Sequence, residues 1–264
     1  MPCLRRMLAA VPVTRLVGRL VGRLVVGGCL YASLTPAVAA SPVFPVERVS
    51  SLEGVQAPRA EPLLLGEVIS SQVRQIIDRS YPELQGLTFE HLTLQSPDVF
   101  FTSNVNLSTL WPTLWSGKPR DVVYRINYNP DFVSAGCPPE AVEAILAHEL
   151  AHTLDYVEGG VPALLGVLNA IRLPQSNARY ERRTDLRAIF RGYGKGLMAY
   201  RQWIYARLTP AELRLKRLTY YTPAEIALLM KALEASQNQE DRLALEARWW
   251  ADPPLSRKAI LASL

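Results

Sequence analysis

Apolar and polar positions recur with two different periods along the chain, and these periods predict its elements. Residues 87–94 and 98–104 are rich in β-branched and aromatic side chains and predict short strands. The run DVVYRINYN at 121–129 predicts a further strand, which Asn129-Pro130 ends. A helix is predicted before them, over 66–79, from four apolar residues at helical spacing: Ile69, Val73, Ile76 and Ile77.

Beyond Pro138 the pattern is helical. Pro138-Pro139-Glu140 begins a helix that Gly159-Gly160 is predicted to end. A second apolar segment closes at Pro174, and a third helix is predicted over 177–191. Two helix starts of the same kind follow, Thr209-Pro210-Ala211-Glu212 and Thr222-Pro223-Ala224-Glu225. Each has the pattern of a capping box with proline at the first helical position.

These elements predict an α+β fold. A small N-terminal β-sheet has an edge strand leading into the helix that begins at Pro138, and a mostly helical C-terminal part follows.

The N-terminal segment 1–40 predicts a targeting signal. It carries five arginines and no acidic residue, then an apolar run from Leu24 to Leu34 and small residues that predict cleavage after Ala39 or Ala40. The expected destination is a secreted or periplasm-like compartment, with an uncleaved membrane anchor and an organelle transit peptide as alternatives. Residues 41–65 are proline-rich and predict a linker, so 66–264 forms the main domain.

The net charge of +5 belongs to this leader, because the remaining 224 residues carry 24 basic and 24 acidic side chains. Nucleic acid is therefore not an expected partner, and membrane association is expected only through the leader. Cys137 is the only cysteine beyond the leader, which excludes an internal disulfide there. It is expected to be a small packed residue rather than a nucleophile.

Two of the three histidines lie four residues apart in AILAHELAHTLDY, at His148 and His152. On a helix this spacing places both rings on one face, about 5–6 Å apart at the β-carbons, so that they can share one ion. Glu149 is rotated by about 100° around the helix axis and can reach a water molecule at an open ligand position. Zinc lowers the pKa of such a water, and the carboxylate can accept its proton. The motif predicts zinc-dependent hydrolysis of an acyl bond, most naturally a peptide.

A third ligand is needed, and three placements are open. Glu181 and Asp185 are four apart on a predicted helix, so Glu181 can bind the ion while Asp185 accepts the free ring N–H of a ligand histidine. Asp185 can instead be the ligand itself. A third ligand six residues after His152 would be Glu158, but Asp155 then stands where a glycine is expected. For Glu181 and Asp185 the alternative is a solvated, charged helix face, which the nearby Arg182, Arg183 and Arg187 would also produce.

The stretch NPDFVSAGCPPEAVEAILAHELAHTLDY, followed by ERRTD, resembles the gluzincin branch of the zincin metallopeptidases. In that family a strand edge binds extended peptide, and zinc is held by HExxH and the glutamate of a downstream ExxxD. The resemblance covers roughly residues 121–190. It implies His148, His152 and Glu181 as ligands of one zinc ion, Glu149 as the base and Asp185 as a partner of a ligand.

The function expected from these residues is that of an exported zinc peptidase acting on a peptide or protein substrate. The alternative is a binding or assembly factor that keeps zinc for structure. His91 lies in a predicted strand and is expected to be structural. Four tyrosines could stabilise an oxyanion, with no basis in the sequence for choosing among them: Tyr124, Tyr128, Tyr180 and Tyr193.

Overall fold

The computed structural model describes residues 62–263 except 97–98, 107, 110–121 and 171–173. The predicted leader and most of the predicted linker lie outside the described residues. The last four linker residues do not, and they begin helix α2 (Pro62–Ser80), which therefore starts before the predicted Gly66.

Three strands form one sheet, in the order β1-β3-β2. They are β1 (Thr88–Thr93), β2 (Phe101–Val105) and β3 (Val123–Tyr128), each within or close to a predicted strand. β1 pairs with β3 in parallel and β2 pairs with β3 antiparallel. The strand that leads toward the HELAH helix is β3, and it is central. The prediction that this strand lies at an edge was wrong, because β2, which precedes it in the chain, pairs with its other side.

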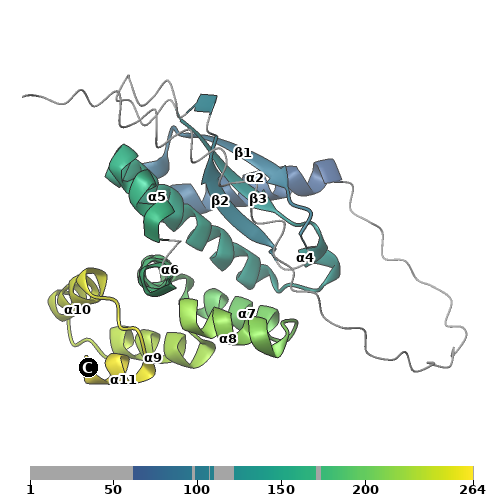
Figure 1. Cartoon of the computed structure of the whole chain (residues 1–264). Coiled ribbons are helices and arrows are strands. Elements are labelled where there is room, and N and C mark those ends of the chain that lie inside the picture. The colour runs from purple at the N-terminus through teal and green to yellow at the C-terminus, as the bar shows by residue number, and fades with distance from the viewer. Residues whose placement is uncertain (1–61, 97–98, 107, 110–121, 171–173, 264) are drawn as a thin grey trace, which may run out of the picture. The chain divides into compact units, whose positions relative to one another are not determined.

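One face of the sheet packs against α2 and α5 (Pro139–Ala170), as Figure 1 shows. The pairing register puts Phe101, Ser103 and Ile126 on this face. Phe101 and Ile126 belong to the main hydrophobic core, together with residues of both helices. The short elements η2 (Pro82–Leu84) and α4 (Asp131–Ser134) connect α2 to β1 and β3 to α5.

Helix α5 is longer than predicted. It continues through Gly159 and Gly160 to Ala170, so the prediction of a helix end at this pair was wrong. A glycine inside a helix costs only about 1 kcal/mol relative to alanine, and the apolar segment that follows can continue the same helix.

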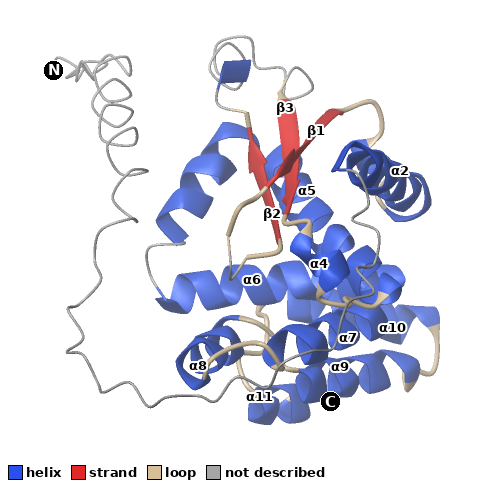
Figure 2. Cartoon of the chain, turned by 90° about the vertical axis from the view of Figure 1, so that its right-hand side faces the viewer, coloured by secondary structure: helices blue, strands red, loops and turns tan. Residues whose placement is uncertain are grey.

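The rest of the described chain is helical and lies on the side of α5 away from the sheet (Figures 1 and 2). The elements are α6 (Pro174–Ala188), the π-helical turn η4 (Ile189–Tyr193), α7 (Gly194–Tyr205), α8 (Pro210–Thr219), α9 (Pro223–Glu234), α10 (Gln239–Ala251) and α11 (Arg257–Ala262). Both predicted capping boxes are confirmed, at Thr209 with Glu212 and at Thr222 with Glu225. The α+β fold class is thus confirmed, and no helix of the described residues is long and apolar enough to cross a membrane.

Candidate metal centre

Helices α5 and α6 bring three candidate ligands together. His148 and His152 lie one turn apart on α5, and Glu181 reaches them from α6. Glu181 Oε2 lies 3.4 Å from His148 Nε2 and 3.3 Å from His152 Nε2. The three side chains offer ligand atoms that all lie within 4.8 Å of one another, so they can hold a metal ion. Apart from these two histidine nitrogens, the buried Glu181 Oε2 has no polar partner among the described residues, as suits an atom that can bind an ion.

The other ring nitrogen of His148 faces Asp185, which is also on α6. His148 Nδ1 lies 2.9 Å from Asp185 Oδ1, and the carboxylate is completely buried. The same oxygen accepts a hydrogen bond from Arg201 of α7 at 2.8 Å. The second oxygen, Oδ2, accepts one from the backbone N–H of Tyr221 at 3.1 Å. Asp185 is therefore held from three sides and orients the His148 ring.

The free ring nitrogen of His152 has a different partner. His152 Nδ1 lies 2.8 Å from the hydroxyl of Tyr180 and 3.3 Å from the hydroxyl of Thr184. Tyr180 is in turn hydrogen-bonded to Tyr156, and Tyr156 to Ser103 of β2. Burial raises the pKa of Tyr156 to about 12, although these two hydrogen bonds lower it. A chain of side chains thus connects the metal group to strand β2. Both histidines have Nδ1 engaged elsewhere, which leaves Nε2 of each free to bind an ion.

The carboxylates of the centre favour a positive charge on His148, and the histidines favour a negative charge on Glu181. Burial acts to lower the pKa of His148, but the contacts with Asp185 and Glu181 outweigh it and raise this pKa to about 9. Burial acts in the opposite sense on Glu181, yet His152 and His148 hold the pKa of its carboxyl below the usual range. A cation is therefore favoured where the two Nε2 atoms and Oε2 meet.

Glu149 points into a cavity beside this group. Its side chain is buried, and burial raises the pKa of its carboxyl, against the lowering effects of both histidines and of a backbone hydrogen bond from Ser103. The cavity has a volume of about 50 Å³. Its lining includes His148, Glu149, two residues of the α8 region (Lys216 and Tyr220), Arg201 and Tyr200 of α7, and apolar side chains of β2, α5 and α7.

The rival placements of the third ligand do not form a metal group in the described residues. Glu158 lies 2.8 Å from Arg187 with half of its side chain exposed, and Asp155 lies 3.3 Å from the same arginine. Asp185 uses its oxygens for His148, Arg201 and Tyr221. The structure thus brings Glu181, and neither Glu158 nor Asp185, to the Nε2 atoms of both histidines.

Helix α6 is not a solvated charged face, although its sequence is strongly polar. Asp185 is buried, and so is Arg182, which contacts Glu225 at 3.5 Å, donates to the carbonyl of Arg217 at 3.2 Å and stacks on Tyr221. The arginines between Glu181 and Asp185 therefore hold α6 against its neighbours.

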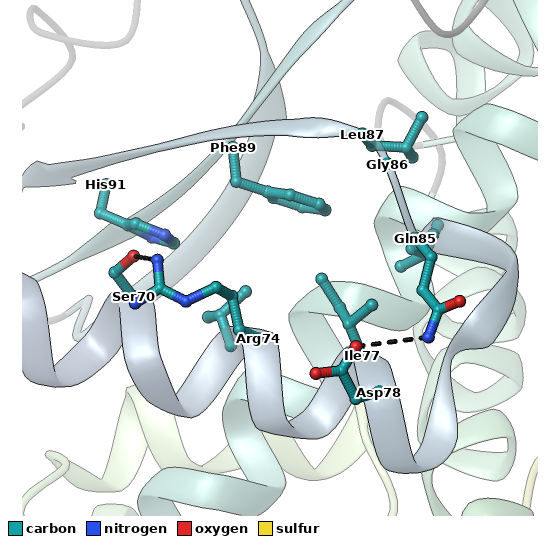
Figure 3. Close-up of a pocket in the computed structure, with 11 residues that line it drawn as sticks. Ser70, Arg74, Ile77, Asp78, Gln85, Gly86, Leu87, Phe89 and His91 are labelled. Atoms are coloured by element: carbon teal, nitrogen blue, oxygen red, sulfur yellow. Dashed lines mark hydrogen bonds between the residues drawn. The ribbon is translucent and has the colours of Figure 1, made fainter.

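His91 lies away from the metal group, in a larger cavity between α2 and β1 (Figure 3). This cavity measures about 460 Å³ and has apolar walls that include Val73, Ile77 and Phe89. No cluster of metal-ligating side chains in the described part of the chain includes His91. Cys137 is half-buried against the core, and burial raises the pKa of its thiol to about 12, which suits a packed residue.

Three residues of the centre were not predicted from the sequence: Arg201, Lys216 and Tyr220. Burial raises the pKa of Tyr220 well above its ordinary value, so its hydroxyl stays a donor beside the metal group. Of the four tyrosines considered, Tyr180 contacts the centre, but it does so through His152. Nothing local marks Tyr220, which follows α8 and reaches the site only through the packing of α8 on α6.

Comparison of the chain with protein-family models, with curated proteins and with solved structures finds no match in any of the three. A function must therefore be argued from the chemistry of the site.

Proposed function

We propose that the protein is a zinc-dependent peptidase. The observation that supports this most is the distance between the candidate ligand atoms. Two atoms bound at about 2.0–2.1 Å to one tetrahedral zinc ion lie roughly 3.3–3.4 Å apart. Glu181 Oε2 lies 3.3 and 3.4 Å from the two histidine nitrogens. Two imidazoles and one carboxylate are also the ligand set of catalytic zinc sites that keep a fourth position open.

Each residue around the centre has a proposed role in the reaction. His148, His152 and Glu181 hold the ion, which when bound supplies a Lewis acid for the scissile carbonyl and for water. Glu149 takes the proton from the attacking water and delivers it to the leaving amine, and its buried position favours such transfer. Tyr220 provides a hydroxyl donor for the negative charge that develops on the carbonyl oxygen.

Strand β2 is the proposed binding edge for an extended substrate. Only one side of β2 is paired in the described sheet, and Phe100 and Phe101 line the cavity that holds Glu149. A peptide added along this edge would form backbone hydrogen bonds and place a peptide bond near the candidate base.

The alternative, a binding or assembly factor with structural zinc, gives no role to Glu149. Structural zinc sites are closed by four protein ligands. Among the described residues the group has three, and a buried carboxylate stands beside it. This arrangement favours catalysis. We further propose that the chain is exported and begins at Ala40 or Ser41 after cleavage, which N-terminal sequencing of the mature protein would test.

The activity can be tested with a chain that starts at Ser41. Incubated with casein, it is expected to release fragments, to stop when a chelator removes the metal and to recover when zinc is restored. A chain that contains stoichiometric zinc and cuts neither casein nor a mixture of unstructured peptides would contradict the proposal.

A further inference from the structure

Lys216, beside the candidate metal group, forms no ion pair with any residue that the structure describes. It belongs to α8 and lines the cavity that also contains His148 and Glu149. No carboxylate of the described residues lies within 4.0 Å of its ammonium group, so Glu181, Glu149 and Glu212 attract it only at longer range. The ring of Tyr220 lies 5.1 Å from the ammonium group. The nearest acid along its own helix, Glu212, is used in the capping box at Thr209.

Arg201 makes a useful comparison, because it lines the same cavity. Its guanidinium donates to Asp185 at 2.8 Å, so its charge is already compensated. Its buried Nε–H has no hydrogen-bond partner among the described residues. Among the described residues, α7 and α8 thus carry one ammonium group outside any ion pair and one buried N–H without an acceptor.

The formal charges around the centre also favour an anion next to Lys216. Among the described residues, three carboxylates act on the centre: Glu149, Glu181 and Asp185. A bound dication and Arg201 together compensate all three, and the charge of Lys216 is then in excess. A partly buried ammonium group is stabilised by a carboxylate at hydrogen-bond distance, and none of the residues that the structure describes supplies one.

The cavity also limits what can reach Lys216. Its volume of about 50 Å³ admits a few water molecules, and hence a group of the size of a carboxylate. Val99, Phe100 and Ile204 add apolar walls, which would disfavour an unpaired polar group of the substrate.

We propose that Lys216 binds a carboxylate of the substrate next to the scissile bond and thereby selects acidic peptides. This inference rests on the proposed peptidase function and adds the substrate class to it. The carboxylate can belong to an aspartate or glutamate side chain or to the C-terminus of the peptide, and both place the same anion against the same ammonium group.

Binding to an inactive protein separates this inference from catalysis. The probes are four pentapeptides: Ala-Ala-Glu-Ala-Ala and Ala-Ala-Gln-Ala-Ala, each with a free or an amidated C-terminus. Their affinities are measured by calorimetry for the zinc-loaded Glu149→Gln chain and for the same chain with Lys216→Met or Lys216→Arg. Arg214→Met is the matched control, because Arg214 is an exposed cation of α8 that does not line the cavity.

One of the carboxylate peptides is expected to bind at least about tenfold more tightly than its neutral counterpart. A hydrogen bond to a charged group changes the affinity by about this factor. Lys216→Met should abolish the preference, whereas Lys216→Arg and Arg214→Met should keep it. The peptide that shows the preference identifies the source: glutamate against glutamine for a side chain, free against amidated for a terminus.

Three results would overturn the inference: no carboxylate preference at all, a preference that survives Lys216→Met, or an equal loss for all four peptides. The last would mean that Lys216 supports the site in general. Casein cleavage by the wild-type chain is measured in parallel. If casein is cut and the preference is absent, only this inference fails. If the zinc-loaded chain cuts nothing, it is the proposed function that fails.

Discussion

The carboxylate of Asp185 lies 2.9 Å from His148 Nδ1, and both groups are buried. This contact fixes which nitrogen of His148 faces the candidate metal site. Asp185→Asn should leave the three candidate ligands in place but weaken the hold on the ring, lowering zinc affinity by about 10–100-fold. Competition with a chromophoric chelator measures this affinity, and circular dichroism checks that the variant is folded. An unchanged affinity in a folded variant would show that Asp185 does not orient the ring.

Glu181→Gln tests the third ligand. A neutral amide is a poor replacement for a carboxylate at a zinc site, so the variant should lose stoichiometric zinc after dialysis. Glu158→Gln is the matched control and should keep its zinc, because Glu158 contacts Arg187 at the surface. The reverse pattern, with zinc lost from Glu158→Gln alone, would assign the third ligand to Glu158.

The pH dependence of zinc binding follows from the raised pKa of His148. In the absence of an ion the pKa of His148 is raised to about 9, so the imidazole carries a proton at neutral pH. Zinc must displace this proton, and affinity should therefore rise about tenfold per pH unit between pH 6.5 and 8. Calorimetry in buffers of different ionisation enthalpy counts the released protons. If affinity stops rising above pH 7, the His148 pKa lies near its ordinary value.

Much of the local structure could be predicted from the sequence, because the signals were local. The strand at 121–129, the HELAH helix and both capping boxes depend on neighbouring residues only. The helix end at Gly159-Gly160 was predicted wrongly, since glycine lowers helix stability without forbidding the helix. The central position of β3 could not be predicted, because strand order depends on pairing between distant segments.

In the candidate site, too, local spacing predicted some residues, whereas others depend on the packing of distant helices. The spacing of the two histidines and of Glu181 with Asp185 indicated which side chains share a face. Arg201, Lys216 and Tyr220 come from later helices, and only the packing of these helices brings them to the centre. The polar sequence of α6 suggested a solvated face, whereas Arg182 and Asp185 are buried in contacts with other elements.

Gly196 tests the packing of α7 on α5. A β-carbon at this position would lie 2.8 Å from the β-carbon of Ala144 and would also collide with the backbone carbonyl of Glu140. Gly196→Ala should therefore lower the free energy of unfolding by about 1–3 kcal/mol, as overpacking does. Lys195→Ala, at an exposed neighbouring position, is the control and should change stability little. Urea denaturation compares the two, and equal stabilities would contradict the close approach of these helices.

The most direct test of the peptidase proposal is Glu149→Gln, assayed for zinc and for hydrolysis in the same preparation. The substitution keeps the shape of the side chain and leaves His148, His152 and Glu181 unchanged. Both proteins are expected to hold one zinc per chain, and the rate of casein hydrolysis should fall by about 10²–10⁴-fold in the variant. A variant that keeps both its zinc and its full activity would contradict the role of Glu149 as the base.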